Sequence, residues 1–281
     1  MEWWQAILLG IVQGLTEFLP VSSSGHLMIC KDLLGIEGEG FLDFTVTVHF
    51  ATVLSTIVVF WKVILDLLKG LFKFKMNDET DYILKIIVSM VPVAVVGLFF
   101  KDKVEALFGN SLVTVAICLI ITALLLFVSD NFAAWKRASL KAENEDRVAD
   151  KPVRNGLTYW QALVVGLGQA FAVAPGLSRS GTTIATGLVF GVKREAIAQF
   201  SFLMVLVPII GEQFLDLLKG LSGEAAIASG IGTLPLILGF LSAFLLGLFA
   251  CKAMIAIVKK ARLTWFAIYC LVISLIILIL A

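Results

Sequence analysis

Long runs of apolar residues dominate the pattern along this chain, and short polar stretches separate them. A helix needs about 20 mostly apolar residues to cross the hydrocarbon core of a bilayer. Segments of this kind lie at 41–61, 83–100, 112–128, 197–217, 232–257 and 264–280. The pattern therefore predicts an all-α integral membrane protein with six transmembrane helices.

Two further apolar segments, 5–28 and 161–190, are interrupted by polar residues, glycine and proline. A simple lipid-facing helix at either place would leave polar groups unpaired in hydrocarbon, which is costly. Broken helices that are buried against the rest of the protein avoid this cost. We therefore expect each segment to form a re-entrant hairpin, in which two short helices enter and leave on the same side.

The two hairpin segments are similar in sequence. When Trp4-Gln5-Ala6 is placed over Trp160-Gln161-Ala162, the same shift of 156 positions aligns further identical residues: Gly10 with Gly166, Gln13 with Gln169, Ser22 with Ser178, Ser24 with Ser180 and Gly25 with Gly181. Such a shared offset indicates an internal repeat. The chain is then a single membrane domain, 1–281, with repeat 1 at about 1–128, a loop at 129–158 and repeat 2 at about 159–281.

Each repeat would hold one hairpin and three spans, so the second repeat enters the membrane from the face opposite to the first. The charges agree with this inverted topology, because the six-span arrangement places most of the 22 Lys and Arg residues on one side. An excess of basic residues marks the cytoplasmic side. We therefore expect the loop at 129–158 to be cytoplasmic and both termini to lie outside.

Composition excludes several other classes of protein. Hydrophobic residues make up 59% of the chain and charged residues 15%, whereas soluble domains are about 45–50% apolar. The formal net charge is +1 and no basic stripe is present, so nucleic acid is not an expected partner. The four cysteines lie far apart and read as small apolar residues. The N-terminus lacks the basic region of a cleaved signal peptide.

Polar residues gather in the first hairpin segment between positions 13 and 26. Gln13 and Glu17 are four residues apart, so their side chains share one face of a helix. A carboxylate at membrane depth is costly unless it is paired, hydrated or bound to a metal, which makes Glu17 a candidate functional residue. Gln13 and Glu17 together offer hard oxygen ligands for Mg²⁺ or Ca²⁺. The alternative is that Glu17 lies at the interface and faces water.

Pro20 breaks that helix, and the run Ser22-Ser23-Ser24-Gly25 leads into a new one. Backbone N–H groups at a helix start suit an anion, although such runs are also common as plain turns or caps. His26 lies one turn after Ser23, so it can act as general base or acid for a Ser23 nucleophile. Alternatively, His26 itself attacks and forms a phosphohistidine. The other histidine, His49, lies in an apolar span and is interpreted as a packed residue.

The second hairpin segment carries a matching motif with an arginine, Pro175-Gly176-Leu177-Ser178-Arg179-Ser180-Gly181-Thr182. The planar guanidinium of Arg179 suits bidentate phosphate binding, and the neighbouring hydroxyl and N–H groups can add donors. The alternatives are that Arg179 extends to an interface or pairs with Glu17. Inverted hairpins can meet near the middle of the membrane, where the two motifs would form one site for two phosphate groups.

Taken together, the motifs at 13–26 and 175–182 resemble those of the undecaprenyl pyrophosphate phosphatase family, bacterial enzymes linked to bacitracin resistance. Length and span pattern agree over essentially the whole chain. The resemblance implies hydrolysis of undecaprenyl diphosphate to undecaprenyl phosphate and inorganic phosphate, which recycles the carrier lipid for cell-wall synthesis. It also implies a bacterial cytoplasmic membrane location, with the active site open to the outer face.

The resemblance implies roles for individual residues as well. Glu17 would belong to a metal-binding motif that allows Glu or Gln at Gln13, and Arg179 would hold the diphosphate. Ser23 and His26 are the candidate nucleophile and base. The remaining candidate phosphate-binding residues are Ser22, Ser24, Gly25, Ser178, Ser180, Gly181 and Thr182.

A transporter is the main alternative, because inverted repeats with broken helices are typical of transporters. Its substrate would be a lipid phosphate or a small anion. The cluster of Glu17, Ser23 and His26 favours catalysis, since an anion conduit gains little from a carboxylate. A scaffold role is disfavoured by Arg179 within a hairpin. The expected partners are an isoprenoid diphosphate and membrane lipids, and the sequence leaves open whether the chain forms a homo-oligomer.

Overall fold

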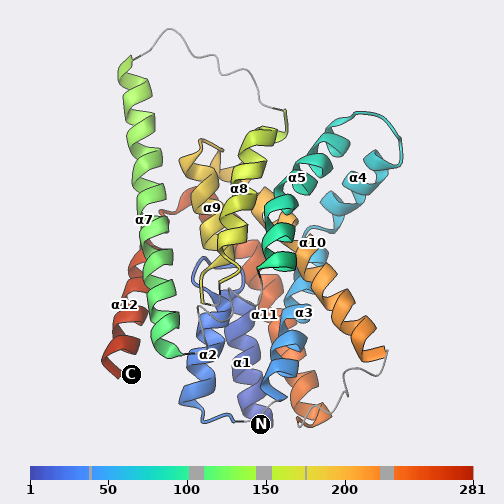
Figure 1. The fold of residues 1–281 in the computed structure, drawn as a ribbon, viewed down its shortest axis with the longest axis vertical. Helices are drawn as coiled ribbons and strands as arrows, with labels where there is room; N and C mark the ends of the chain where they lie inside the picture. The colour runs from blue at the N-terminus through green and yellow to red at the C-terminus, as the bar shows by residue number, and fades with distance from the viewer. Residues whose placement is uncertain (38–39, 101–110, 144–153, 175, 222–230, 281) are drawn as a thin grey trace.

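The computed structural model describes residues 1–37, 40–100, 111–143, 154–174, 176–221 and 231–280 (Figure 1). Every regular element in these ranges is helical, and no strand occurs among them. The prediction of an all-α protein is therefore confirmed. Pro175 of the second motif and residues 144–153 of the expected loop lie outside the described residues.

The first hairpin segment forms two short helices, α1 (Trp3–Thr16) and α2 (Ser23–Leu33). The chain continues through α3 (Gly40–Val59), α4 (Trp61–Leu71), α5 (Asp78–Phe99) and α7 (Leu112–Glu143). After a short 3₁₀ turn, η1 (Arg154–Gly156), the second hairpin segment forms α8 (Tyr159–Phe171) and α9 (Arg179–Val189). The remaining helices are α10 (Arg194–Leu221), α11 (Thr233–Lys260) and α12 (Thr264–Leu280).

Helices α3, α5, α7, α10 and α11 are long and apolar enough to cross a membrane, and each overlaps a predicted span. Helix α12 is apolar over 17 residues and has the predicted bounds, 264–280. The chain is therefore a multi-pass membrane protein by the length and composition of its helices.

Two features differ from the prediction. Helix α7 continues to Glu143, so the first part of the expected loop at 129–158 is helical. The Ala, Leu, Lys and Glu residues between 133 and 143 favour a helix in water as well, so hydropathy does not mark the end of the helix. Helix α4 was not predicted, because Lys62, Asp66 and Lys69 make it too polar to read as a span.

The two hairpins enter from opposite ends of the molecule (Figure 1). Helices α1 and α2 lie at the end that holds both termini, whereas α8 and α9 lie at the other end, and the two turns meet between them. The Ser180 hydroxyl donates a hydrogen bond to the Leu19 carbonyl oxygen at 3.2 Å, which joins the second turn to the first. Residues far apart in the sequence are thereby brought into one region.

The shift of 156 positions that aligns the hairpin sequences also relates their hydrogen bonds. Gln5 Nε2 donates to the carbonyl oxygen of Leu34 at 3.3 Å. In the second hairpin Gln161 Nε2 donates to the carbonyl oxygen of Phe190 at 2.9 Å, and both partners differ by 156 from their counterparts. Each glutamine ties the start of its hairpin to the end of the second helix, which explains why the same residue type occupies both positions.

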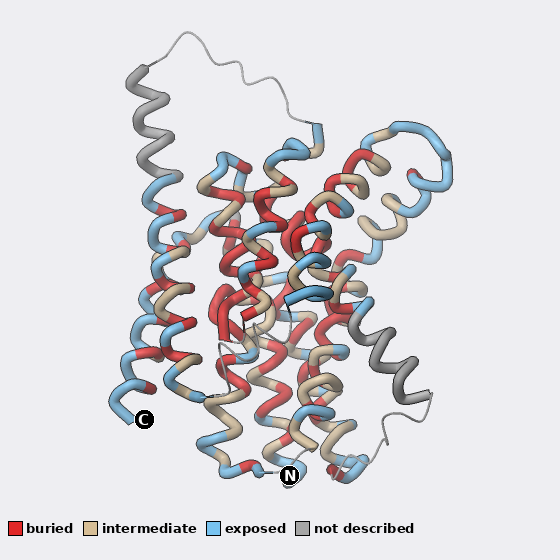
Figure 2. The backbone as a smooth tube through the Cα atoms, viewed as in Figure 1, coloured by how far each residue is buried: buried red, intermediate tan, exposed pale blue. Residues whose placement is uncertain are grey.

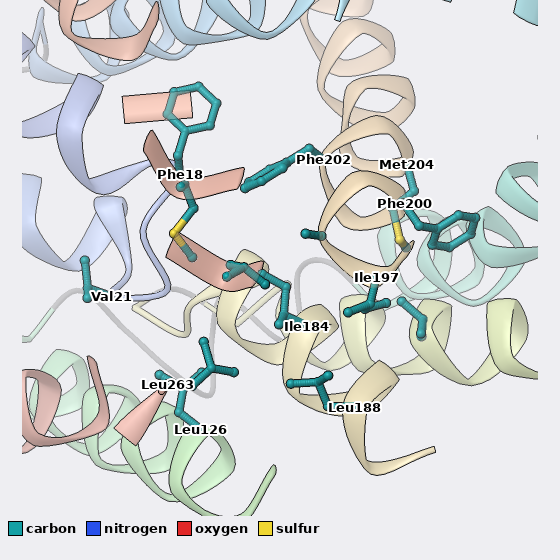
Figure 3. Close-up of a cluster of buried hydrophobic side chains, with 14 of the residues drawn as sticks. Phe18, Val21, Leu126, Ile184, Leu188, Ile197, Phe200, Phe202, Met204 and Leu263 are labelled. Carbon is teal, nitrogen blue, oxygen red and sulfur yellow. The ribbon is translucent and has the colours of Figure 1, made fainter. Parts of the chain in front are cut away.

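Buried residues concentrate where the hairpins meet the longer helices (Figure 2), and many of the buried residues are apolar. One cluster joins Phe18 of the first turn, Ile184 of α9 and Phe200 and Phe202 of α10 (Figure 3). The Phe18 and Phe202 rings make an edge contact at 6.0 Å. Large apolar side chains also remain exposed along the outer helices, as expected where lipid replaces water.

Candidate active site

The turn of the first hairpin is shaped by Pro20 and by the backbone of Ser22. Proline lacks an N–H group and disfavours continuation of α1. Ser22 has φ 68° and ψ 92°, which is uncommon for a residue with a side chain. Its hydroxyl accepts a hydrogen bond from the Gly25 N–H group at 3.3 Å and caps α2. Ser23 is consequently the first residue of α2 and lies beside Glu17.

Three side chains lie close to the Oε2 oxygen of the Glu17 carboxylate. Gln13 Nε2 donates to Oε2 at 2.9 Å, and the Ser23 hydroxyl donates to the same oxygen at 2.5 Å. His49 Nε2 lies 3.7 Å from it. Arg179 lines the same cavity as Glu17. Glu17 therefore shares this cavity with a hydroxyl, an imidazole and a guanidinium.

The turn of the second hairpin places Arg179 opposite the first turn. Gly176 has φ 87°, a conformation that glycine adopts without a steric penalty. The Ser178 hydroxyl accepts a hydrogen bond from the Gly181 N–H group at 3.1 Å and caps α9, just as Ser22 caps α2. Arg179 is the first residue of α9, and its guanidinium makes no hydrogen bond within the described part of the chain. That guanidinium is therefore available to an anion.

Both turns line one cavity of about 210 Å³, together with residues of α3 and α10. Its polar lining residues include Glu17, Ser23, His49 and Arg179. Pockets that enclose a whole drug-sized ligand measure about 300–1,000 Å³. The cavity is smaller than these, which suits a polar head group whose apolar chain lies outside.

The structure brings many of the predicted site residues to this cavity. Those that line it are Glu17, Ser22, Ser23, Ser24, Ser178, Arg179 and Ser180. The predicted residues that do not line it are Gln13, Gly25, His26, Gly181 and Thr182. Gly25 and Gly181 supply the capped N–H groups, and the Thr182 hydroxyl donates to the Ser178 carbonyl oxygen within α9 at 2.8 Å. These residues stabilise the turns through hydrogen bonds and do not line the cavity themselves.

His26 is turned away from the cavity. Its Nδ1 donates to the carbonyl oxygen of Ser22 at 2.8 Å, so Nε2 accepts from the Tyr269 hydroxyl of α12 at 2.8 Å. Both ring nitrogens are thus engaged by groups other than Glu17, and neither His26 nor Tyr269 lines the cavity. The role of His26 as a base or nucleophile stays a prediction. Either role would require the hydrogen bond between His26 and Tyr269 to break.

His49 is a cavity residue that sequence reasoning missed. It was interpreted as a packed residue of an apolar span, yet it lines the cavity from α3, and 17% of its side chain is exposed. One signal was present in the sequence. An ionisable residue within a span is costly in lipid and is therefore a functional candidate by default.

Comparison with known proteins shows the family of the chain. Residues 6–276 match the family described as bacitracin resistance protein BacA. The chain belongs to this family. Relatives within it are named undecaprenyl-diphosphatase. The protein of Bacteroides fragilis is 52% identical over 98% of this chain and 96% of its own length. The protein of Bacteroides thetaiotaomicron is 51% identical over 99% of both chains. A more distant relative, from Carboxydothermus hydrogenoformans, is 38% identical over 100% of this chain and 98% of its own.

Gln13 and Glu17 offer oxygen atoms to the divalent cation that the sequence predicts, and of the two only Glu17 lines the cavity. Gln13 Oε1 is fully buried and has no hydrogen-bond partner among the described residues, and the adjacent Glu17 supplies a carboxylate. No cluster of three or more His, Cys, Asp or Glu residues that could hold a metal occurs in the described ranges. This ligand set suits an ion such as Mg²⁺, which takes one or two carboxylates and completes its coordination with water and substrate phosphates.

Proposed function

We propose that this protein hydrolyses undecaprenyl diphosphate to undecaprenyl phosphate and inorganic phosphate, and so recycles the lipid carrier of cell-wall synthesis. The relatives' names supply the substrate. The observation that carries the proposal is the 2.5 Å hydrogen bond from the Ser23 hydroxyl to Glu17 Oε2, in a cavity that also contains Arg179. This arrangement combines a nucleophile, a base and an anion-binding group.

The reaction begins with Ser23. Its oxygen attacks the terminal phosphorus, while Glu17 Oε2 takes the hydroxyl proton that already faces it. The bond between that phosphorus and the bridging oxygen breaks, and undecaprenyl phosphate leaves. Glu17 gives the proton to the leaving phosphate and becomes a base again. A water molecule then attacks the phosphoserine and passes a proton to Glu17, while the bond between phosphorus and Ser23 Oγ breaks. Glu17 returns that proton to Oγ, which releases phosphate and restores Ser23. Glu17 is placed to take the Ser23 proton, because its Oε2 already lies 2.5 Å from the Ser23 hydroxyl oxygen.

Arg179 and the two helix starts bind the diphosphate. The guanidinium can grip two phosphate oxygens in parallel, which a single point charge cannot do. The N-termini of α2 and α9 both reach the cavity, through Ser23 and Arg179, and their backbone dipoles favour negative charge. These groups stabilise the charge that develops on the transferred phosphoryl group.

Glu17 and Gln13 would hold a divalent cation, Mg²⁺ or Ca²⁺, which neutralises phosphate charge when bound. Gln13 also donates to Glu17 Oε2 and orients the carboxylate. The geometry favours Ser23 over His26 as the nucleophile, since the Ser23 hydroxyl faces Glu17 whereas both ring nitrogens of His26 are engaged elsewhere.

The proposed membrane arrangement is a single domain of two inverted repeats, at about 1–128 and 159–281, with six spans and two re-entrant hairpins. It is supported by the entry of the hairpins from opposite ends and by the equivalent bonds of Gln5 and Gln161. The basic end would face the cytoplasm of a bacterial inner membrane. Both termini then lie outside, and the active site opens to the outer face.

The test is phosphate release from undecaprenyl diphosphate by the purified protein in detergent, with and without a divalent cation. Detergent micelles have no two sides, so a transporter would give no product there. We expect release by the wild-type protein and none above background by the Ser23→Ala variant. Equal release by both proteins, or release by neither, would overturn the proposed reaction.

A further inference from the structure

The α4 corner, residues 61–77, consists of helix α4 and the turn that leads to α5. It projects from the bundle at the end opposite both termini (Figure 1). One side of α4 packs against the protein through Val63, Ile64 and Leu67, which are partly buried against the core. The turn at 71–76 is exposed at every residue, as Figure 2 shows in pale blue. The rest of the corner therefore faces water or lipid.

The exposed sides of α4 form two adjacent stripes. Both follow the spacing of residues that share one face of a helix. The apolar stripe consists of Trp61, Leu68 and Phe72, all exposed. The second stripe lies one position further along the chain and is mostly basic, with Lys62, Asp66, Lys69 and Lys73 all exposed. An apolar stripe beside a lysine-rich one is typical of a helix that lies in the plane of a membrane surface.

Phe74 lies in the turn of the α4 corner, between Lys73 and Lys75. It is 90% exposed. Its φ of 49° is uncommon for a residue with a bulky side chain. The turn is held in this shape by Asn77, whose Nδ2 donates to the Gly70 carbonyl oxygen at 2.8 Å. An aromatic ring that is fixed between two lysines suits the boundary between acyl chains and lipid headgroups.

The charge of the α4 corner indicates which headgroups it prefers. The corner holds four lysines and one aspartate, a net charge of +3, and Glu79 reduces this only to +2. The other two carboxylates at the start of α5 are paired, Asp78 with Arg154 and Asp81 with Lys85, each at 2.6 Å. A cluster of lysines at a membrane surface attracts anionic lipids.

We propose that the α4 corner lies along the membrane surface and binds the headgroups of anionic phospholipids. The apolar stripe and Phe74 then enter the upper acyl region, while the lysines contact phosphate groups. The bilayer is the occupant that the connections favour. Only Phe60 separates α4 from the apolar helix α3, and the turn leads directly into the apolar helix α5. The corner therefore cannot move far from the lipid.

The experiment replaces Phe74 with the photo-crosslinking residue p-benzoylphenylalanine in the full-length protein. The protein is placed in phosphatidylcholine vesicles that contain phosphatidylglycerol as the anionic lipid, and mass spectrometry identifies the attached lipids. We expect phosphatidylglycerol to be enriched at least ~3-fold over its share of the vesicle, since one lysine near an anionic surface contributes up to about 5-fold. Added salt and the triple variant Lys69→Gln/Lys73→Gln/Lys75→Gln should each lower this enrichment.

The chain offers a matched control for each change. Phe127 of α7 is exposed and has no lysine or arginine within four positions. The same crosslinker at Phe127 should therefore give lipid adducts without enrichment. The variant Lys193→Gln/Lys252→Gln/Lys260→Gln removes three other exposed lysines and should keep the enrichment at Phe74. Thermal unfolding shows whether each variant is folded, and the enrichment at Phe74 itself needs no lysine variant.

Several outcomes would overturn the proposal. One is lipid adducts at Phe127 with none at Phe74, and another is adducts at Phe74 in the proportions of the vesicle. Equal loss of enrichment in the two lysine variants would show that total charge matters and the α4 corner does not. In whole cells, attachment of Phe74 to another protein in place of lipid would assign the surface to a protein partner.

Discussion

Gly10 and Gly166 make equivalent close contacts in the two hairpins. A Cβ atom on Gly10 of α1 would lie 2.4 Å from the carbonyl oxygen of Gly239 in α11. A Cβ atom on Gly166 of α8 would lie 2.2 Å from the carbonyl oxygen of Ser89 in α5. Each hairpin thus packs directly against the backbone of a long helix from the other half of the chain.

This contact predicts that Gly166→Ala destabilises the protein although alanine favours helices. Overpacking against backbone costs typically about 1–3 kcal/mol, which exceeds the gain of up to about 1 kcal/mol from helix propensity. Thermal unfolding in detergent should show a lower midpoint. Gly97→Ala in α5 is the control, because among the described residues no atom apart from its chain neighbours and its own helix backbone lies within 4 Å of its added Cβ. Equal midpoints for the two variants would contradict the close packing.

Glu17→Gln should lower turnover at least ~100-fold, because general base catalysis typically contributes about 10²–10⁴-fold. The amide keeps the size of the side chain but cannot take the Ser23 proton. Glu17→Asp retains the charge and should be less impaired, although its shorter side chain moves the carboxylate away from Ser23. The measurement is kcat for phosphate release at saturating substrate. Wild-type kcat in Glu17→Gln would exclude Glu17 as the base.

Arg179→Lys should lose at least ~10-fold in kcat/KM, equivalent to about 1.4 kcal/mol of transition-state stabilisation. Lysine preserves the positive charge but not the planar fork that binds two phosphate oxygens. Activity is measured across a range of substrate concentrations so that binding and turnover are separated. If the lysine variant matched the wild-type protein, charge alone would suffice and bidentate binding would be excluded.

Ser23→Ala should be nearly inactive, whereas His26→Ala should keep activity, because the proposed nucleophile and its base Glu17 both remain. Mass spectrometry of protein quenched during turnover should locate the phosphoryl group on Ser23. A phosphoserine is acid-stable, so acid quenching preserves it. An acid-labile, base-stable adduct on His26 would instead show that the histidine attacks.

The topology predicts that a reporter fused after Ala281 lies outside the cytoplasm. A reporter inserted at Lys141 should lie inside, because the basic residues of that region mark the cytoplasmic side. An alkaline phosphatase fusion is active outside the cytoplasm, whereas a green fluorescent protein fusion gives its signal inside it. Both reporters on the same side of the membrane would contradict an odd number of spans in the second repeat.

The sequence alone determined the elements whose signal is local. The apolar run at 264–280 coincides with α12, and the polar interruptions at 5–28 and 161–190 predicted the helix pairs α1–α2 and α8–α9. Hydropathy did not mark the end of α7, since its last turns are helical without being apolar. The local pattern of hydropathy indicates which residues of a segment can be buried in lipid or protein. It does not indicate how far a helix extends into water.

The same distinction applies to the site. Glu17 and Ser23 are six residues apart in one motif, and the predicted turn was sufficient to place them together. The approach of His49 to Glu17 and the bond between His26 and Tyr269 depend on how α3 and α12 are rotated and packed against the first hairpin. The rotation of each helix is set by side-chain contacts across the whole fold. The spacing of residues along the sequence does not encode these contacts. Tertiary structure therefore decided which imidazole faces the cavity.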